Sequence, residues 1–88
     1  MGAARPPLGK FIAFEGGEGT GKSTQVKLLA DAIGARATRE PGGTRLGAML
    51  RAHLIDPETT DLGVMAEMLM MATDRAQHIH EVIVPTLN

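Results

Sequence analysis

The sequence predicts an α/β fold, a parallel sheet with helices on both faces, of which this chain is an incomplete N-terminal part. The apolar run Phe11 to Phe14 leads directly into a glycine-rich motif, and an amphipathic pattern follows that motif. The chain has 88 residues, whereas one strand with its crossover takes about 30 residues. A parallel sheet needs several strands covered on both faces. We therefore expect a truncated chain.

The glycine-rich motif runs from Gly16 to Ser23 and matches G-x-x-x-x-G-K-[ST] at every fixed position. Glycines let the backbone fold back with its N–H groups pointing inward, Lys22 adds a mobile positive charge, and the Ser23 hydroxyl can ligate Mg²⁺. The positive end of the following helix faces the same point. The motif predicts that the N–H groups from Gly17 to Ser23 surround a phosphate.

The first half of the chain contains both predicted strands. Residues 10–15 form the first strand, since their apolar run suits a buried parallel strand. A helix is predicted from Gly21 or Lys22 to about Ile33, with Gly34 as its left-handed C-terminal cap. Its apolar residues are Val26, Leu29, Ala30 and Ile33. Residues 35–39 are predicted as a short second strand from topology, because alanine and arginine are poor strand formers.

The second half is predicted to be helical. Thr44 can cap a helix that ends at residues 56–57, where the sequence is Asp-Pro. The apolar side of this helix carries Leu46, Leu50 and Leu54. Thr60 or Asp61 is predicted to start a longer helix with apolar residues at helical spacing. Pro85 should kink or terminate that helix.

Composition favours a small anionic ligand over a nucleic acid. The formal net charge is −1, the chain has no cysteine, and its only aromatic residues are two phenylalanines. Residues 1–9 lack the apolar core of a signal peptide and are predicted to be a disordered lead-in to a single unit over residues 10–88. No apolar run approaches the roughly 20 residues that span a bilayer. We expect a cytoplasmic protein without a membrane segment.

Glu18 places a carboxylate within the glycine-rich motif. A carboxylate that points toward bound phosphates is electrostatically unfavourable. Pointing outward, it faces a hydroxyl of a second substrate beside the terminal phosphate of the nucleotide. The alternative is that Glu18 only solvates the loop surface, because the variable positions of the motif accept any residue. Spacing alone leaves both alternatives open.

The segment from Arg39 to Thr44 follows the second predicted strand, at the carboxyl end where open α/β sheets bind ligands. Its Pro-Gly-Gly sequence is equally typical of an ordinary turn. Arg51 lies about two helical turns beyond Thr44 and could face a phosphate. A lone arginine on a helix is, however, commonly a solvated surface residue.

Met71 and Arg75 share one face of the last predicted helix, since they are four residues apart. Together they offer an apolar side chain and a hydrogen-bonding guanidinium, which would suit a planar base. Met68, Met70 and Met71 could equally be ordinary core residues. His78 and His80 have no partners at metal-ligand spacing and are predicted to bind no metal.

Several stretches, in this order, resemble bacterial thymidylate kinases. They are Phe14-Glu15-Gly16, Gly21 to Gln25, Thr38 to Thr44, Asp74 to His78, and Val82-Ile83 with Pro85. The P-loop alone is shared with many unrelated proteins, whereas the Arg-Glu-Pro-Gly-Gly-Thr string followed by Arg-Ala-Gln-His is specific. The resemblance covers residues 10–88 and implies the P-loop NTPase fold of the nucleoside monophosphate kinase type.

The resemblance implies transfer of a phosphoryl group from ATP to thymidine monophosphate with Mg²⁺, in a protein that is a homodimer when complete. Lys22 and Glu18 resemble catalytic residues, Ser23 the metal ligand, and Pro41 a proline that is commonly cis. The residues that resemble the ATP phosphate-binding set are Gly16, Gly17, Glu18, Gly19, Thr20, Gly21, Lys22, Ser23 and Thr24. Those that resemble the thymidine monophosphate-binding set are Glu18, Arg39, Glu40, Pro41, Arg51, Met71 and Arg75. Within that set, Glu18 would approach the 3′-hydroxyl, Arg51 the acceptor phosphate and Arg75 the thymine.

The sequence also departs from the family pattern. Met71 stands where the family usually has an aromatic residue that stacks on thymine. Residues 17–20 include no arginine, so catalytic arginines would come from a lid that this chain does not contain. The chain stops at Asn88, before the strand expected to bring an Asp-Arg pair. Two alternatives stay open: another nucleoside monophosphate kinase, or a phosphate-binding remnant without turnover.

Overall fold

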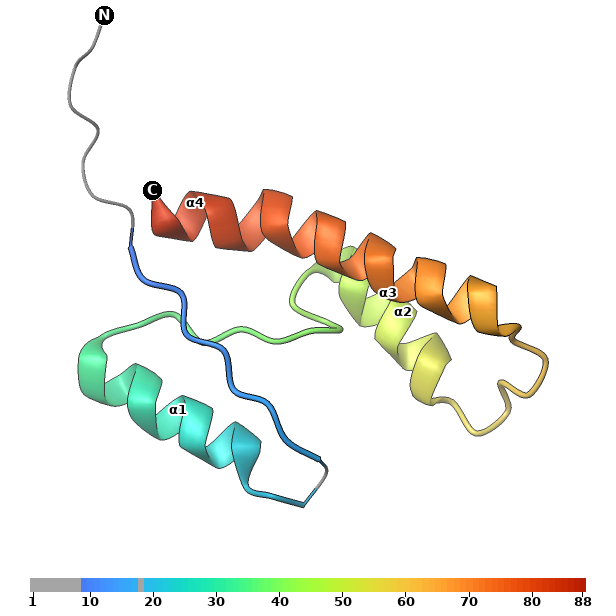
Figure 1. Ribbon diagram of the computed structural model, residues 1–88, viewed down its shortest axis with the longest axis horizontal. Coiled ribbons are helices and arrows are strands. Elements are labelled where there is room, and N and C mark those ends of the chain that lie inside the picture. The colour runs from blue at the N-terminus through green and yellow to red at the C-terminus, as the bar shows by residue number, and fades with distance from the viewer. Residues whose placement is uncertain (1–8, 18) are drawn as a thin grey trace, which may run out of the picture.

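The computed structural model describes residues 9–17 and 19–88, and in this part of the chain the regular elements are all helical. They are α1 (Lys22–Ile33), α2 (Arg45–Ile55), α3 (Val64–His78), the π-helix η1 (Ile79–Ile83) and α4 (Val84–Leu87). Figure 1 shows α2 beside α3, and α3, η1 and α4 as one continuous rod. Helix α1 lies apart from that rod, with extended segments between the two (Figure 1).

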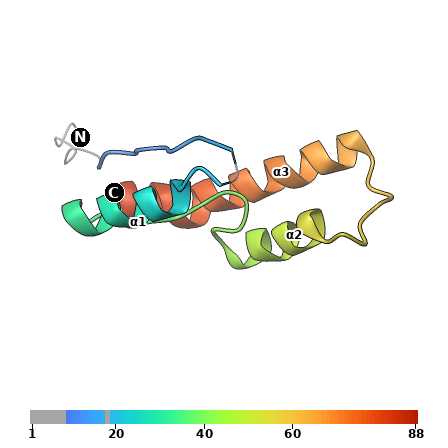
Figure 2. The ribbon, with the colours of Figure 1, turned by 90° about the horizontal axis from the view of Figure 1, so that it is seen from below.

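The molecule is flat and open. Its principal extents are 51 × 35 × 19 Å, and Figure 2 shows the thin direction. The Cα radius of gyration is 15.8 Å, whereas a compact domain of this length would have about 12 Å. Among the described apolar side chains, those of Ala30 and Val82 are buried, while Phe11 stays 59% exposed. The apolar surface is therefore largely uncovered.

The prediction of strands at residues 10–15 and 35–39 is wrong for this chain, since both segments are without regular secondary structure. They run as extended chain in Figure 1. A groove of about 1370 Å³ is lined by both segments, by α1 and by the C-terminal rod. A strand is defined by hydrogen bonds to a neighbouring strand. Segments that face each other across a groove have no such neighbour.

Helices α1 and α2 confirm the predicted boundaries. Helix α1 begins after Gly21 and ends at Gly34, whose φ of 68° is the left-handed conformation expected of that cap. Helix α2 begins after Thr44, whose hydroxyl oxygen accepts a hydrogen bond from the backbone N–H of Gly47 at 2.9 Å. Asp56 is the C-terminal cap of α2. Local capping chemistry thus sets these ends.

The start of α3 differs from the prediction. The sequence indicated Thr60 or Asp61, whereas Gly63 is the residue that precedes the helix. The turn after α2 extends further than expected, because the Thr59 hydroxyl donates to the carbonyl of His53 at 2.7 Å and the Thr59 N–H donates to the carbonyl of Asp56 at 2.9 Å. The chain re-enters a helix only after this turn.

Pro85 does not terminate the C-terminal helix. It lies in the first turn of α4, directly after the five-residue π-helix η1. Proline has no N–H, and its ring clashes with the carbonyl four residues earlier. A π-turn displaces that carbonyl from the usual α-helical position. The local widening at η1 therefore accommodates Pro85 within a continuous helical rod.

The two ends of the described chain meet. The N–H of Gly9, within the predicted lead-in, donates to the carbonyl of Leu87 at 2.8 Å. The rest of that predicted lead-in, residues 1–8, lies outside the described residues, as does Glu18. Of the described helices, none combines the length and the apolar character that a membrane crossing needs.

Candidate functional site

The glycine-rich loop curls before α1. Gly19 and Gly21 have positive φ values of 77° and 78°, a conformation that residues with a side chain rarely adopt. The Thr20 hydroxyl donates to the carbonyl of Gly17 at 2.8 Å and so closes the loop on itself. The first N–H groups of a helix have no acceptor within the helix. The free N–H groups of the first turn of α1 therefore lie next to the curled loop.

A cleft of about 330 Å³ opens beside this loop. Its lining consists of Gly16, Gly17, Gly19, Thr20, Gly21, Lys22, Ser23, Thr24 and Arg51. The Lys22 ammonium group donates to the carbonyl of Gly16 at 3.3 Å, so it stays at the loop. Arg51 comes from α2 and adds a second cation. An ammonium, a guanidinium and a helix N-terminus around one cleft favour an anion.

Arg51 is held toward the cleft by the turn between residues 39 and 44. Its Nη1 donates to the carbonyl of Pro41 at 3.1 Å, and the side chain is half-buried. The peptide bond between Glu40 and Pro41 is cis, which confirms the expectation for that proline. Gly42 has a φ of 110°, and a Cβ there would lie 3.0 Å from Cδ of Arg51. The turn and Arg51 thus fit closely together.

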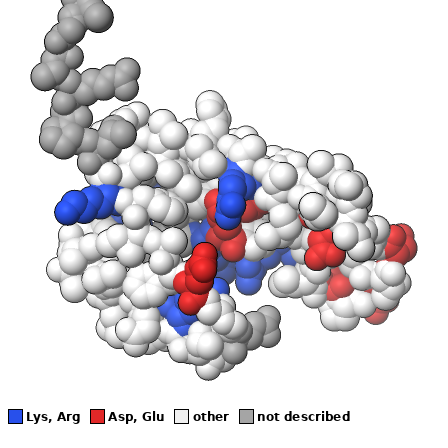
Figure 3. Space-filling model, in the orientation of Figure 1, with Lys and Arg blue, Asp and Glu red and all other residues white. Residues whose placement is uncertain are grey.

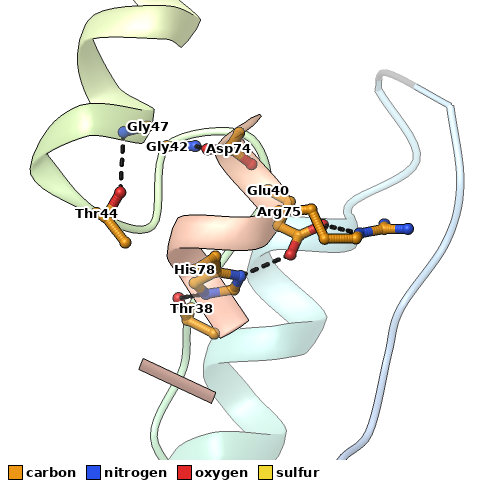
Figure 4. Close-up of polar contacts among 8 residues, drawn as sticks. All are labelled: Thr38, Glu40, Gly42, Thr44, Gly47, Asp74, Arg75 and His78. Atoms are coloured by element: carbon orange, nitrogen blue, oxygen red, sulfur yellow. Dashed lines mark hydrogen bonds and ion pairs between the residues drawn. The ribbon is translucent and has the colours of Figure 1, made fainter. Parts of the chain in front are cut away.

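A polar cluster of Thr38, Glu40, Arg75 and His78 joins this turn to α3 (Figure 4). One carboxylate oxygen of Glu40 accepts from Nε of Arg75 at 2.8 Å, and the other lies 2.8 Å from Nδ1 of His78. Nε2 of His78 lies 2.7 Å from the Thr38 hydroxyl. Figure 3 shows basic and acidic side chains side by side around the central hollow.

Opposing effects act on the pKa of Glu40. Burial is the largest single effect and raises it, but the hydrogen bonds from His78 and Arg75, together with the nearby charges of these groups, lower it by more in sum. The net result is a pKa below the ordinary value of 4.5. Glu40 is therefore a carboxylate at neutral pH, and it accepts from both neighbours.

Asp74 of α3 also contacts the same turn. Its Oδ1 accepts from the backbone N–H of Gly42 at 3.0 Å, and the residue is 1% exposed. The second oxygen, Oδ2, has no hydrogen-bond partner in the described structure. A Cβ at Gly47 would collide with Oδ1, so the N-terminus of α2 packs directly against this carboxylate.

Three of the predicted thymidine monophosphate-binding residues line the large groove, and Met71 does not. The three are Arg39, Glu40 and Arg75, although Met71 shares a helical face with Arg75. Ser23, the predicted metal ligand, lines both the groove and the cleft. Among the described residues, no group of three or more histidine, aspartate or glutamate side chains is arranged to hold a metal ion.

Sequence reasoning gave no role to Thr38, Asp74 or His78, and the structure places all of them at the junction of the turn and α3. His78 is 2% exposed and hydrogen-bonds with two protein groups. One signal was present: Asp74 and His78 are four residues apart, so two polar side chains share one face of the helix. Their partners, which lie more than 30 residues away, left no such signal.

The chain is similar to proteins of one family. A sequence profile described as thymidylate kinase matches residues 14–88. Proteins named thymidylate kinase from Exiguobacterium sibiricum and Desulfovibrio desulfuricans are 45% and 50% identical over 84 and 82 residues. These matches cover 90% and 88% of this chain but 40% and 38% of the relatives, so the chain spans about two fifths of their length. Most of the chain matches the profile, and it therefore belongs to the thymidylate kinase family.

Proposed function

We propose that the complete protein transfers the terminal phosphoryl group of ATP to thymidine monophosphate, which gives ADP and thymidine diphosphate. The observation that carries this proposal is the shared cleft, in which Lys22 and Ser23 of the glycine-rich loop meet Arg51 of α2. Phosphoryl transfer depends mainly on positioning and charge neutralisation. A cleft with cations from two separate elements can hold two phosphate groups against each other.

The donor side is the glycine-rich loop. The first-turn N–H groups of α1 and the ammonium group of Lys22 would bind the ATP phosphates. Bound Mg²⁺ supplies charge neutralisation on the phosphate oxygens. Ser23 fits this ion as a ligand, because it carries a hydroxyl oxygen and lines the same cleft. The full donor set is Gly16, Gly17, Glu18, Gly19, Thr20, Gly21, Lys22, Ser23 and Thr24.

The acceptor side is formed by α2, the turn after residue 38 and α3. Arg51 would hold the acceptor phosphate, because it lines the cleft and one nitrogen of its guanidinium is fixed by the Pro41 carbonyl. Arg75 would hydrogen-bond the thymine, with Arg39, Glu40 and Met71 around it. We assign Glu18 to the 3′-hydroxyl by its place in the loop sequence, since it lies outside the described residues.

We also propose the parallel sheet of the P-loop NTPase fold for the complete protein. The groove of about 1370 Å³ between residues 10–15 and 35–39 leaves room for further strands that would pair with both segments. Large apolar side chains exposed on α2 and α3, such as Met49 and Met65, support a homodimer packed through helices. The expected location is the cytoplasm.

The acceptor assignment is tested in a complete enzyme, made by joining residues 1–88 to the part of the Exiguobacterium sibiricum protein that the match does not cover. Arg51→Ala should raise the KM for thymidine monophosphate about 10- to 100-fold, as expected for the loss of a charged hydrogen-bonding partner. The KM for ATP should stay within about twofold. Arg45→Ala is the matched control, since Arg45 is an exposed residue of the same helix outside the cleft.

An unchanged KM for thymidine monophosphate in Arg51→Ala would contradict the acceptor site. Equal losses for both nucleotides, together with a lowered melting temperature, would mean that Arg51 acts through folding. Turnover with another nucleoside monophosphate and none with thymidine monophosphate would favour a different member of the nucleoside monophosphate kinases. Phosphate binding without any turnover would favour the non-catalytic alternative.

A further inference from the structure

Arg75 presents its terminal nitrogens to the outside. Its side chain is 71% exposed, and it is anchored through Nε, which donates to Oε1 of Glu40 at 2.8 Å. A guanidinium has five N–H donors in a fixed plane. The Nε bond uses one of them, and Figure 4 shows the two terminal nitrogens directed away from Glu40. A ligand can therefore use donors of Arg75 that Glu40 leaves available.

Glu40 is in turn fixed by a buried group. Its second oxygen lies 2.8 Å from Nδ1 of His78, whose side chain is 2% exposed. The other ring nitrogen, Nε2, lies 2.7 Å from the Thr38 hydroxyl. A proton on Nδ1 is donated to the carboxylate of Glu40, and Nε2 shares a hydrogen bond with the Thr38 hydroxyl, which can donate or accept, so each ring nitrogen has a suitable partner. The imidazole is thereby held at both nitrogens.

We infer that His78 is a positioning residue for the acceptor base, because it fixes Glu40 and thereby orients the guanidinium of Arg75. This inference rests on the proposed function, in which Arg75 contacts thymine. The contacts lead from the buried ring of His78, through the half-buried carboxylate of Glu40, to the exposed guanidinium of Arg75. A long exposed side chain that is ordered before binding loses less entropy when the ligand arrives.

A purely structural role of His78 makes a different prediction. A buried histidine between two polar partners would stabilise the protein through either contact, and its loss would affect both nucleotides alike or neither. A positioning role depends on the Nδ1 contact alone, since that contact reaches Glu40. The two ring nitrogens can be tested separately, because an asparagine amide lies near the place of Nδ1 and a glutamine amide near that of Nε2.

The experiment uses the complete enzyme described above. His78→Gln keeps a partner for Thr38 and removes the one for Glu40, so it should raise the KM for thymidine monophosphate about 3- to 10-fold. The KM for ATP should not change. His78→Asn keeps a donor for Glu40 and should restore the KM to within about twofold of the unsubstituted enzyme. In an Arg75→Ala background, His78→Gln should have no further effect, because the group that it positions is gone.

The outcomes separate the inference from the proposed function. If Arg75→Ala raises the KM for thymidine monophosphate and a folded His78→Gln does not, the positioning role is wrong and the acceptor site stands. If His78→Asn is as defective as His78→Gln, only ring packing matters, and the inference is also overturned. If Arg75→Ala leaves the KM for thymidine monophosphate unchanged, the positioning role of His78 and the assignment of Arg75 to the thymine are both wrong. Should His78→Gln not fold, Glu40→Ala takes its place, because it removes the carboxylate that joins His78 to Arg75, and its effect on the KM for thymidine monophosphate should likewise vanish in the Arg75→Ala background.

Discussion

The N-terminal cap of α2 offers a measurable connection between local chemistry and the site. Thr44 is 6% exposed, and its hydroxyl oxygen accepts from the N–H of Gly47 at 2.9 Å. Removing such a cap costs about 0.5–2 kcal/mol of the free energy of unfolding, typically about 1 kcal/mol. In a complete enzyme of about 150–250 residues, 1 kcal/mol lowers the melting temperature by roughly 2–4 °C. We expect that shift for Thr44→Ala.

Thr44→Ser is the matched control, because it keeps the hydroxyl oxygen and removes only the methyl group. Its melting temperature should stay within about 1 °C of that of the unsubstituted enzyme. Thermal unfolding followed by circular dichroism measures both variants under the same conditions. Equal losses in Thr44→Ser and Thr44→Ala would show that the methyl packing stabilises this junction, and the capping explanation would be refuted.

Gly47, Glu40 and the isolated 88-residue chain each give a further prediction. Gly47→Ala should lower the free energy of unfolding by about 1–3 kcal/mol in urea titrations despite the better helix propensity of alanine, because the added Cβ meets the Asp74 carboxylate; no loss would contradict this packing. The lowered pKa of Glu40 means that its stabilising contribution is present above about pH 4.5 and is lost as the pH falls through the folded-state pKa. The stability difference between the unsubstituted enzyme and Glu40→Gln should therefore shrink from about pH 6 to about pH 3, and a constant difference would argue against the ionic contacts. The 88 residues by themselves should unfold without a sharp transition and show no thymidylate kinase activity, because Phe11 and other large apolar side chains remain exposed and the cleft lacks further arginines.

Elements fixed by neighbouring residues could be predicted from the sequence. The ends of α1 and α2 depend on Gly34, Thr44 and Asp56, whose capping interactions lie within one or two turns. The segments at residues 10–15 and 35–39 could not be judged in this way, since strand formation requires hydrogen bonds from a neighbour that local periodicity does not reveal. The same limit applies to Pro85: the sequence did not reveal the preceding π-helix, which lets the helical rod continue past the proline.

In the candidate site, too, features set by contiguous residues could be predicted and contacts between distant residues could not. The glycine-rich loop is a contiguous motif, so its curled conformation could be expected from residues 16–23 alone. The sequence left two alternatives open for Arg51; in the structure Arg51 lines the cleft and its guanidinium donates to the Pro41 carbonyl, whereas its contact with a phosphate stays a prediction. The contacts of His78 with Thr38 and Glu40 join residues 38 to 40 positions apart. Such pairs follow from the fold and not from spacing.

Lys22 in the complete enzyme offers the most direct test of phosphoryl transfer at this cleft. Lys22→Ala should lower kcat for thymidine monophosphate phosphorylation at least about 100-fold, because it removes a preorganised cation from the cleft. Its melting temperature should stay unchanged, since the Lys22 side chain is exposed and bonds only to a loop carbonyl in the described structure. Lys27→Ala, an exposed lysine of the same helix outside the cleft, should keep full turnover. Turnover in Lys22→Ala equal to that of Lys27→Ala would contradict the assignment of this cleft to phosphoryl transfer.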